Sequence, residues 1–224
     1  MNINLNFKVP LDDIEPKMVR SIRDLALVLM EVINRIQGYL KVTSEGNVRI
    51  CSDDNMKRIF FYEENRMYSM MFPFSLQRRI DGVYAEERYF REEYCFVWNT
   101  IEIDSAIISA VISLLKNDKL TEYAKLSYEN FLFEIDACLN EYDCVYDVDV
   151  VWGIYYQLLS NEYGYVRFDH DEQHVGSNHP LNHLDINMSN ECTYKIGLPN
   201  NPRASEKWFA EMCLSNPVKC INVL

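Results

Sequence analysis

All four histidines of this chain fall within 14 residues, between His170 and His183, with carboxylates interspersed among them. Imidazole and carboxylate side chains are the groups that proteins most often use to bind metal ions and to move protons. Chance alone would rarely crowd every histidine of a 224-residue chain so closely. We therefore look for chemistry first in the segment YVRFDHDEQHVGSNHPLNHLDIN.

Strand alternation predicts which of these side chains share a surface. The runs YVRFD, HLDIN and TYKIGL alternate apolar and polar residues, which is typical of strands whose apolar side chains point into a core. If these strands are neighbours, their polar side chains collect on one outward face, which could hold a divalent ion and a phosphate or move a proton beside one. The predicted members are Arg167, Asp169, His183, Asp185 and Lys195.

Candidate roles follow from this arrangement. The acid–base candidates are Asp169, His179, His183 and Asp185, the anion-binding candidates are Arg167 and Lys195, and the metal-ligand candidates are Asp169 and Asp171. The cofactor stays open, with a divalent metal ion as one candidate. The opposing interpretation is a solvated sheet face with exposed ion pairs, in which His179 and Pro180 only form a loop that leads into the next strand.

The spacing of the histidines argues against a structural zinc site. His170 and His174 form an H-x3-H pair, as do His179 and His183. On a strand this spacing separates the ring nitrogens by about 13 Å, which is too far for one ion. A helix would bring each pair together, but Gly176 and Pro180 lie in the same segment, and proline disfavours a helix interior. A shared ion would need a loop that folds back on itself.

The rest of the chain predicts the elements that position this segment. Apolar residues recur at helical spacing over about 15–40, where Pro16 suits the first turn and Gly38 the end. Strand-like runs follow, with hairpin turns expected at 43–46 and 63–65 and a strand at about 94–103. A helical block should span about 104–160, with N-caps at Asp104 or Ser105 and at Thr121, and a last helix is expected near 204–214.

These elements predict an α+β fold. We expect an antiparallel or mixed sheet packed with several helices, in one domain that comprises residues 1–224. Within it, the helical insertion occupies about 104–160 and the histidine-containing signature segment about 163–200. A chain of this length buries roughly 70% of its unfolded surface and needs no metal or disulfide to fold.

Composition and cysteine content narrow the class of protein. With 48% hydrophobic and 25% charged residues, the chain is neither a disordered protein nor a membrane bundle. Its longest apolar stretch, 106–115, is too short to span a bilayer. Seven cysteines with no C-x-x-C pair indicate reduced thiols, and the N-terminus has no signal-peptide pattern, so we expect a cytoplasmic protein that does not bind membranes. The Walker, G-x-S-x-G, G-x-G-x-x-G and H-E-x-x-H motifs are absent from the sequence.

The charge distribution suggests a surface for a partner. The net charge is −12, which disfavours tight binding to naked nucleic acid. From 126 to 166 the sequence contains no Lys or Arg but several carboxylates, of which we single out Asp143, Asp147 and Asp149. The simpler interpretation is a solvated acidic face. The alternative is a docking surface for a basic protein partner.

The C-terminal segment also resembles a known family. Arg167-Phe168-Asp169-x-Asp171, then His179-Pro180-x-x-His183-Leu184, then Cys192 is similar to the pattern RFDFD…HPxxHLT…CRIP of the bacterial family called domain of unknown function 2290. The similarity covers about 40 residues. This chain departs from it at Lys195 and Gly197, where the family pattern has Arg and Pro, and at His170, where it has an aromatic residue. The resemblance implies a setting among accessory genes of bacterial antiviral defence and mobile elements, and favours His179 and His183 over His170 and His174.

Three functions remain open at this point. The first is a subunit of a multi-protein bacterial defence complex that docks a protein partner through its acidic helices. The second is a metal-dependent phosphodiesterase, nuclease-like protein or toxin enzyme that uses the Asp/His segment 167–195, with His183 as acid or base. The third is a sensor of a small anion near Arg167. The subunit is the function that we expect.

Overall fold

The computed structural model describes residues 3–14, 19–54, 56–79, 89–117, 128–141, 145–189, 192–198 and 205–214. The chain divides into two compact units, and each unit gathers segments that lie far apart in the sequence. The first unit comprises Met1–Lys8, Thr43–Phe72 and Glu162–Leu224, and the second comprises Val9–Val42 and Pro73–Asn161. The signature segment therefore belongs to the first unit and the helical block to the second.

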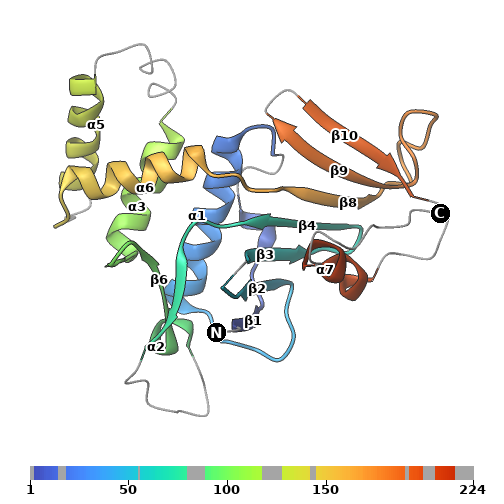
Figure 1. The fold of residues 1–224 in the computed structure, drawn as a ribbon, viewed down its shortest axis with the longest axis horizontal. Coiled ribbons are helices and arrows are strands. Elements are labelled where there is room, and N and C mark those ends of the chain that lie inside the picture. The colour runs from blue at the N-terminus through green and yellow to red at the C-terminus, as the bar shows by residue number, and fades with distance from the viewer. Residues whose placement is uncertain are drawn as a thin grey trace. The chain divides into compact units, whose positions relative to one another are not determined.

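The first unit is built on an antiparallel sheet (Figure 1). Among the described residues, seven strands follow one another across the sheet in the order β1-β2-β3-β4-β8-β9-β10. Their bounds are β1 Ile3–Phe7, β2 Val48–Ser52, β3 Lys57–Tyr62, β4 Arg66–Met71, β8 Val166–His170, β9 Asn182–Ser189 and β10 Cys192–Gly197. Every neighbouring pair is antiparallel, so the α+β class and the antiparallel sheet are as predicted.

A short C-terminal helix, α7 (Glu206–Leu214), covers one face of this sheet. Phe209 of α7 is fully buried, and its ring meets that of Phe60 edge-on, with the ring centroids 6.4 Å apart. Phe168 of β8 and Leu184 of β9 belong to the same apolar cluster. Burying an aliphatic or aromatic side chain of this size contributes roughly 1.5–3 kcal/mol. The cluster therefore fixes which face these two strands present to α7, and alternation sends the adjacent residues to the opposite face.

The N-terminal part of the sheet differs from the sequence prediction. The pattern did not indicate β1, and the hairpin expected around 43–46 is wrong. Instead, β2 lies between β1 and β3, with Leu5 opposite Ile50, while Lys41 forms only an isolated bridge to Tyr89. Gly46 permits the close approach of the chain to β1, because a Cβ atom there would lie 2.1 Å from the Phe7 carbonyl oxygen. The second expected hairpin, at 63–65, is confirmed by the pairing of β3 with β4.

The second unit consists of helices and a small antiparallel sheet. In the described residues, the sheet has the order β5-β6-β7. The strands are β5 Ser75–Arg78, β6 Tyr94–Trp98 and β7 Ile101–Glu102; the helices are the 3-10 turn η1 Leu11–Asp13, α1 Ile22–Tyr39, α2 Phe90–Glu93, α3 Ser105–Lys116, α5 Tyr128–Glu141 and α6 Val148–Ser160. The strand expected at 94–103 is thus two strands, which turn at Asn99 with a φ of 55°.

Side-chain caps explain where two of the helices begin. Ser21 accepts a hydrogen bond from the Asp24 N–H, and the Asp24 carboxylate accepts one from the Ser21 N–H, so this capping box starts α1 at Ile22 rather than near residue 15. Asp104 accepts from the Ile107 N–H and caps α3, as predicted. The cap expected at Thr121 lies outside the described residues.

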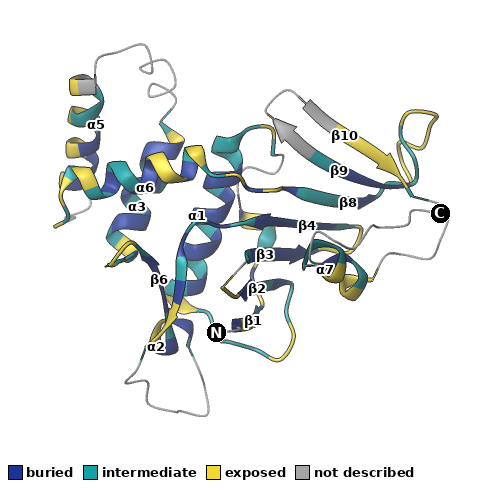
Figure 2. Ribbon diagram, in the orientation of Figure 1, coloured by how far each residue is buried: buried dark blue, intermediate teal, exposed yellow. Residues whose placement is uncertain are grey.

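Burial differs strongly along the sheet (Figure 2). Strands β3 and β4 are mostly buried, whereas residues 194–197 of the edge strand β10 are exposed. Within the ranges that the structure describes, none of the helices combines the length and the apolar run that crossing a bilayer requires.

Candidate functional site

Three neighbouring strands bring the predicted polar residues onto one sheet face. In the antiparallel register, Arg167 of β8 lies opposite Asp185 of β9, and Asp185 lies opposite Lys195 of β10. Two pairs further along, Asp169 lies opposite His183. Residues that face each other across an antiparallel pair point to the same side. The polar face therefore has the five members that alternation predicts, and β8, β9 and β10 are neighbours as expected.

A network of ion pairs joins these side chains. The Arg167 guanidinium bridges two carboxylates, because its Nε donates to Asp169 Oδ2 at 2.6 Å and one terminal nitrogen donates to Asp185 Oδ2 at 2.6 Å. Lys195 Nζ lies 2.8 Å from Asp185 Oδ1 in an ion pair that lacks hydrogen-bond geometry. Arg66 Nε donates to Asp169 Oδ1 at 3.0 Å. Three cations thus face two carboxylates.

Sequence reasoning missed Arg66, which belongs to this network through β4. It lies opposite Asp169 across the β4–β8 pair, although 103 residues separate the two in the chain. Only the strand order of the sheet brings them together. A sequence pattern read along one segment carries no signal of such a neighbour.

His183 is the most enclosed member of the face. Its side chain is 1% exposed, and the side chains of Asp169 and Asp185 are 10% and 9% exposed. The ring Nδ1 lies 2.8 Å from the Pro180 carbonyl oxygen, and the buried Nε2 makes no hydrogen bond to any described residue. Nε2 lies 3.6 Å from Asp169 Oδ2 and 3.9 Å from Asp185 Oδ1. Within the described residues, these three side chains are the one group that presents closely spaced metal-ligand atoms.

Burial at this edge of the sheet differs from the prediction, although Phe168 and Leu184 are buried as expected. Alternation predicted that Tyr194 and Ile196 would point into a core and that His183 would face solvent. Tyr194 is 58% exposed and Ile196 38%, whereas His183 is buried. Mutually paired charges tolerate burial where isolated charges do not, so a polar face of this kind need not face water.

The β8–β9 loop collects a second group of titratable residues. Asp171 Oδ2 lies 2.9 Å from His174 Nδ1 and 3.2 Å from His179 Nε2. The loop folds back through an isolated bridge between Gly176 and His179, and the His179 ring meets the His183 ring edge-on at a centroid distance of 4.6 Å. Asp171 therefore accompanies the loop histidines, whereas Asp169 accompanies His183 and Asp185. The two predicted metal ligands lie in different clusters.

Hydrogen bonds hold Asp171 ionised. Desolvation acts to raise its pKa, but the hydrogen bond to the His174 ring and those from the Gln173 and His174 N–H groups lower the pKa of Asp171 to about 2.

On the sheet face, the charges around Arg167 outweigh its burial. Burial acts to lower the pKa of Arg167, but the adjacent Asp169 carboxylate, followed by Tyr165 and Asp185, raises it overall. Burial raises the pKa of the neighbouring Tyr165 phenol to about 12, against the opposing effect of Arg167.

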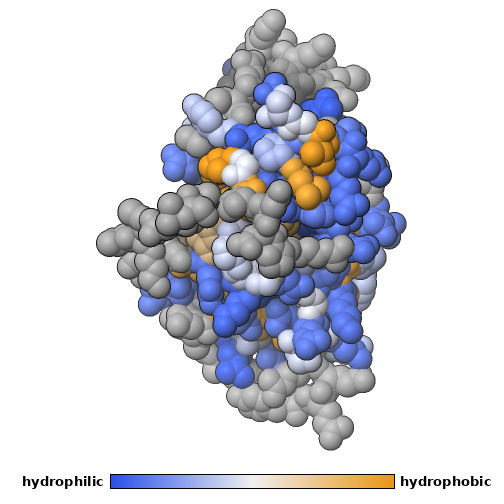
Figure 3. Space-filling model, turned by 90° about the vertical axis from the view of Figure 1, so that its right-hand side faces the viewer, coloured by the Kyte–Doolittle hydropathy of each residue, from blue (hydrophilic) through white to orange (hydrophobic). Residues whose placement is uncertain are grey.

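The view from the right-hand side of Figure 1, where the loop 171–181 lies, is given in Figure 3. Hydrophilic residues dominate the described part of this surface, with a small group of hydrophobic residues among them. Val175 in the loop is 59% exposed. A mostly polar surface with scattered apolar side chains is the ordinary state of a protein exterior.

The predicted docking surface is part of a groove between α5 and α6 in the second unit. Asp147 and Asp149 are exposed at the start of α6, whereas Asp143 lies outside the described residues. The groove has a volume of about 660 Å³ and is lined by Glu129, Leu132, Phe133, Asp136, Asp147, Val148 and Asp149. We call it the α5–α6 groove. It carries four carboxylates and no basic residue among its described lining, and Phe133 is 71% exposed.

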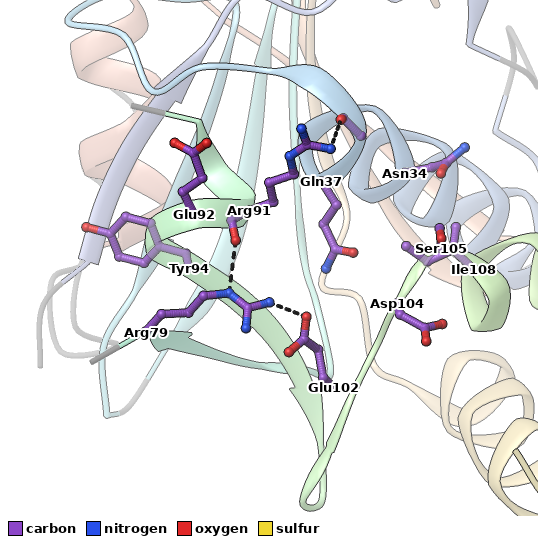
Figure 4. Close-up of a pocket in the computed structure, with 11 residues that line it drawn as sticks. Asn34, Gln37, Arg79, Arg91, Glu92, Tyr94, Glu102, Asp104, Ser105 and Ile108 are labelled. Atoms are coloured by element: carbon purple, nitrogen blue, oxygen red, sulfur yellow. Dashed lines mark hydrogen bonds and ion pairs between the residues drawn. The ribbon is translucent and has the colours of Figure 1, made fainter. Parts of the chain in front are cut away.

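A further pocket in the second unit was not expected from the sequence (Figure 4). It has a volume of about 450 Å³, and its lining comes from α1, α2, β6, β7, α3 and Arg79, the residue that follows β5. Arg79 pairs with Glu102 and donates to the Arg91 carbonyl oxygen at 2.9 Å, and the buried Gln37 amide nitrogen makes no hydrogen bond among the described residues. The lining residues come from so many segments that no local pattern could indicate the pocket.

Comparison with known proteins adds no relative. No protein-family model, no curated protein and no solved structure matches this chain.

Proposed function

We propose that this chain is an accessory subunit that docks a basic segment of a protein partner in the α5–α6 groove. The observation that carries the proposal is the exposed Phe133 between Glu129, one turn before it, and Asp136, three residues after it, on α5. A large aromatic side chain surrounded by carboxylates matches a partner that offers an apolar side chain flanked by Lys or Arg.

The inner face of α5 explains why Phe133 points outward. Phe131 packs edge-on against Trp152 of α6, with the ring centroids 4.7 Å apart, and Ile135 is fully buried. These contacts already anchor α5, so Phe133 is not needed to hold the helix in place. An exposed aromatic side chain of no structural use is more informative than a buried one.

Helix stability alone accounts for part of the acidic groove. Asp147 and Asp149 lie at the N-terminus of α6, where negative charge interacts favourably with the helix dipole. Asp136 lies in the interior of α5, where this explanation does not apply. The exposure of the Phe133 side chain is not explained by helix stability either. Docking accounts for all four residues together.

The resemblance of the C-terminal segment to domain of unknown function 2290 supports the setting of the proposal. It implies a bacterial cytoplasmic protein encoded among defence or mobile-element genes, whose products commonly assemble. The partner then comes from an adjacent gene of the same system. It supplies Lys or Arg side chains that complement the four carboxylates of the α5–α6 groove.

The test is co-purification of the tagged chain with the products of its neighbouring genes. Asp147→Asn with Asp149→Asn removes two charges and keeps the size of both side chains, and Phe133→Ser removes the apolar contact. Both variants should lose the partner and stay folded. The Asp variant should melt at most a few degrees lower, because only the helix-dipole interaction of two exposed carboxylates is lost. Raising salt to about 1 M should release the partner from the unmodified chain, since exposed charge pairs are screened within about 3 Å at that concentration.

A matched control separates a local contact from a general charge effect. Glu45→Gln with Glu64→Gln also removes two exposed carboxylates, but in the first unit. This variant should keep the partner. Equal loss of the partner by both charge variants would mean that net charge, and not the groove, determines binding.

A second function is favoured by the polar face of the sheet. An imidazole between two carboxylates, with three cations around them, is a set of groups suited to a phosphodiester. In this proposal, cleavage of a phosphodiester probe such as bis-p-nitrophenyl phosphate is lost in Asp169→Asn. No cleavage by the unmodified chain, with or without divalent ions, would reject it.

The proposal of a small-anion sensor at Arg167 has less support. The guanidinium already donates to Asp169 and Asp185. An incoming anion would have to compete with both carboxylates.

A further inference from the structure

The buried imidazole of His183 faces the carboxylates of Asp169 and Asp185 but makes no hydrogen bond to either of them. Its Nδ1 lies 2.8 Å from the Pro180 carbonyl oxygen. A carbonyl oxygen only accepts, so Nδ1 carries a hydrogen, and in the neutral ring, the form that binds metal ions, the lone pair lies at Nε2. That lone pair points toward oxygen atoms of Asp169 and Asp185, which also carry lone pairs. A cation between these three atoms would give the buried Nε2 a partner, which it does not have among the described residues.

The distances distinguish a metal ion from a proton. A proton shared between imidazole and carboxylate draws the heavy atoms to about 2.7–2.9 Å. The observed separations from His183 Nε2 are 3.6 Å to Asp169 and 3.9 Å to Asp185. Two ligands of a tetrahedral ion, each bound at about 2.1 Å, stand about 3.4 Å apart. The two His183 separations approach that value and are too wide for a direct hydrogen bond, and the three ligand atoms all lie within 4.8 Å of one another.

We propose that Asp169, His183 and Asp185 bind a divalent cation. The inference rests on neither proposed function, because a bound ion is compatible with a docking subunit and with an enzyme. Two carboxylates and one imidazole form an oxygen-rich set with one nitrogen, which suits Mn²⁺, Fe²⁺ or Zn²⁺ and gives no preference for the soft ions that thiols select. The set replaces the pair Asp169 and Asp171 as the expected ligands, because Asp171 lies in the loop cluster.

The residues behind the ligands are arranged to orient them. Arg167 fixes both carboxylates. On Asp185 it donates to Oδ2, the oxygen that does not face His183, whereas on Asp169 it donates to Oδ2, which also faces His183. The Pro180 carbonyl oxygen fixes the His183 ring and its tautomer. Hydrogen bonds to the far side of a ligand are the usual support of protein metal sites, and their loss typically costs 10–100-fold in affinity.

Lys195 allows a test in which one substitution should raise the affinity for the metal ion while others lower it. Its ammonium lies 2.8 Å from Asp185 Oδ1, the same oxygen that faces His183. An ammonium and a divalent ion compete for that oxygen, and Lys195 can withdraw because its side chain is 27% exposed on the edge strand β10. Removing the ammonium should therefore raise the affinity for the metal ion, whereas removing a ligand should lower it.

The experiment is a titration of the full chain with Mn²⁺, with the free ion followed by electron paramagnetic resonance. Mn²⁺ is chosen because it binds thiolates weakly, so the seven cysteines do not interfere. We expect one site per chain. Asp169→Asn and Asp185→Asn should each weaken binding by about tenfold or more, and Lys195→Met should strengthen it by several-fold. His183→Ala is less suitable alone, because removing a fully buried ring can unfold the sheet edge.

Two controls complete the design. Asp171→Asn removes a carboxylate of the loop cluster, and Asp147→Asn with Asp149→Asn removes carboxylates of the α5–α6 groove. Both should leave the Mn²⁺ affinity unchanged. The proposal is overturned if the unmodified chain binds no Mn²⁺, if Asp171→Asn weakens binding as much as Asp169→Asn, or if Lys195→Met weakens it. Non-specific binding to the acidic surface would appear as loss in the groove variant, and would also overturn it.

Discussion

At the scale of single residues, hydrogen bonding decides the state of each carboxylate in the signature segment. Asp169 and Asp185 are buried and share Arg167, so their charges are compensated within the protein. Asp171 is held by its loop instead, through the His174 ring and two backbone N–H groups. The two arrangements predict different effects of mutation on the stability of the folded chain. Loss of Arg167 would leave two buried carboxylates undercompensated, whereas loss of Asp171 would release only the loop.

The lowered pKa of Asp171 predicts a specific response to acid. Its folded-state value of about 2 lies below its ordinary value of 3.8, so folding favours the ionised form. The ionised Asp171 carboxylate therefore stabilises the folded chain. This stabilisation is fully present above the unfolded-state pKa of 3.8 and is lost as the pH falls through the folded-state pKa of about 2. Urea unfolding at a series of pH values should show a constant difference between the unmodified chain and Asp171→Asn above about pH 5. The difference should shrink toward pH 2. Parallel stability curves at every pH would contradict the assignment.

At the scale of elements, glycine positions separate close packing from open space. Gly46 lies where a Cβ atom would meet the backbone of β1, with its nearest contact at 2.1 Å from Phe7. Gly38, near the end of α1, has nothing within 4 Å of the corresponding position. Backbone atoms cannot move aside as a flexible side chain can. The same substitution should therefore have opposite effects at the two sites.

Gly46→Ala should destabilise the chain by about 2 kcal/mol or more, since the loop must separate from β1. Gly38→Ala should stabilise it by about 0.4–1 kcal/mol, because alanine costs less entropy in a helix. Chemical denaturation of both variants beside the unmodified chain measures whether each substitution lowers or raises the free energy of unfolding. A neutral Gly46→Ala would show that β1 does not pack against this loop.

The strand alternation of the signature segment is local and could be predicted, because α7 and the cluster around Phe168 and Leu184 fix one face. The hairpin at 43–46 could not be predicted correctly, since its turn residues gave a local signal while the true partner of β2 is β1, more than 40 residues away. Arg66 was missed for the same reason. The burial of His183 was missed because polar residues on a strand most often face water, and its compensation depends on side chains from three other strands.

At the scale of the whole molecule, thiol burial and surface charge are the properties that determine its interactions. The four cysteines whose side chains are described, Cys51, Cys95, Cys138 and Cys213, are all free. Burial raises the pKa of each of these thiols, and that of Cys213 to about 11. A thiol with a raised pKa contains little thiolate at neutral pH and reacts slowly.

Alkylation measures this directly. In the native protein at neutral pH, iodoacetamide should label these four thiols slowly, and after unfolding without reductant it should label every cysteine of the chain. Mass spectrometry of the peptides gives both results. A pair of cysteines that stays protected after unfolding would reveal a disulfide and would contradict the expectation of a reducing compartment.

The central claim, that the α5–α6 groove docks a basic partner, is tested most directly by zero-length cross-linking of the native complex. A carbodiimide joins an activated carboxylate to a lysine without a spacer, so it couples groups that come into direct contact, as the two members of an ion pair do. At about 0.15 M salt, we expect the cross-links to the partner to map to Glu129, Asp136, Asp147 and Asp149, and to disappear at about 1 M salt. Cross-links that map instead to exposed carboxylates elsewhere, such as Glu45 and Glu64, would contradict the claim.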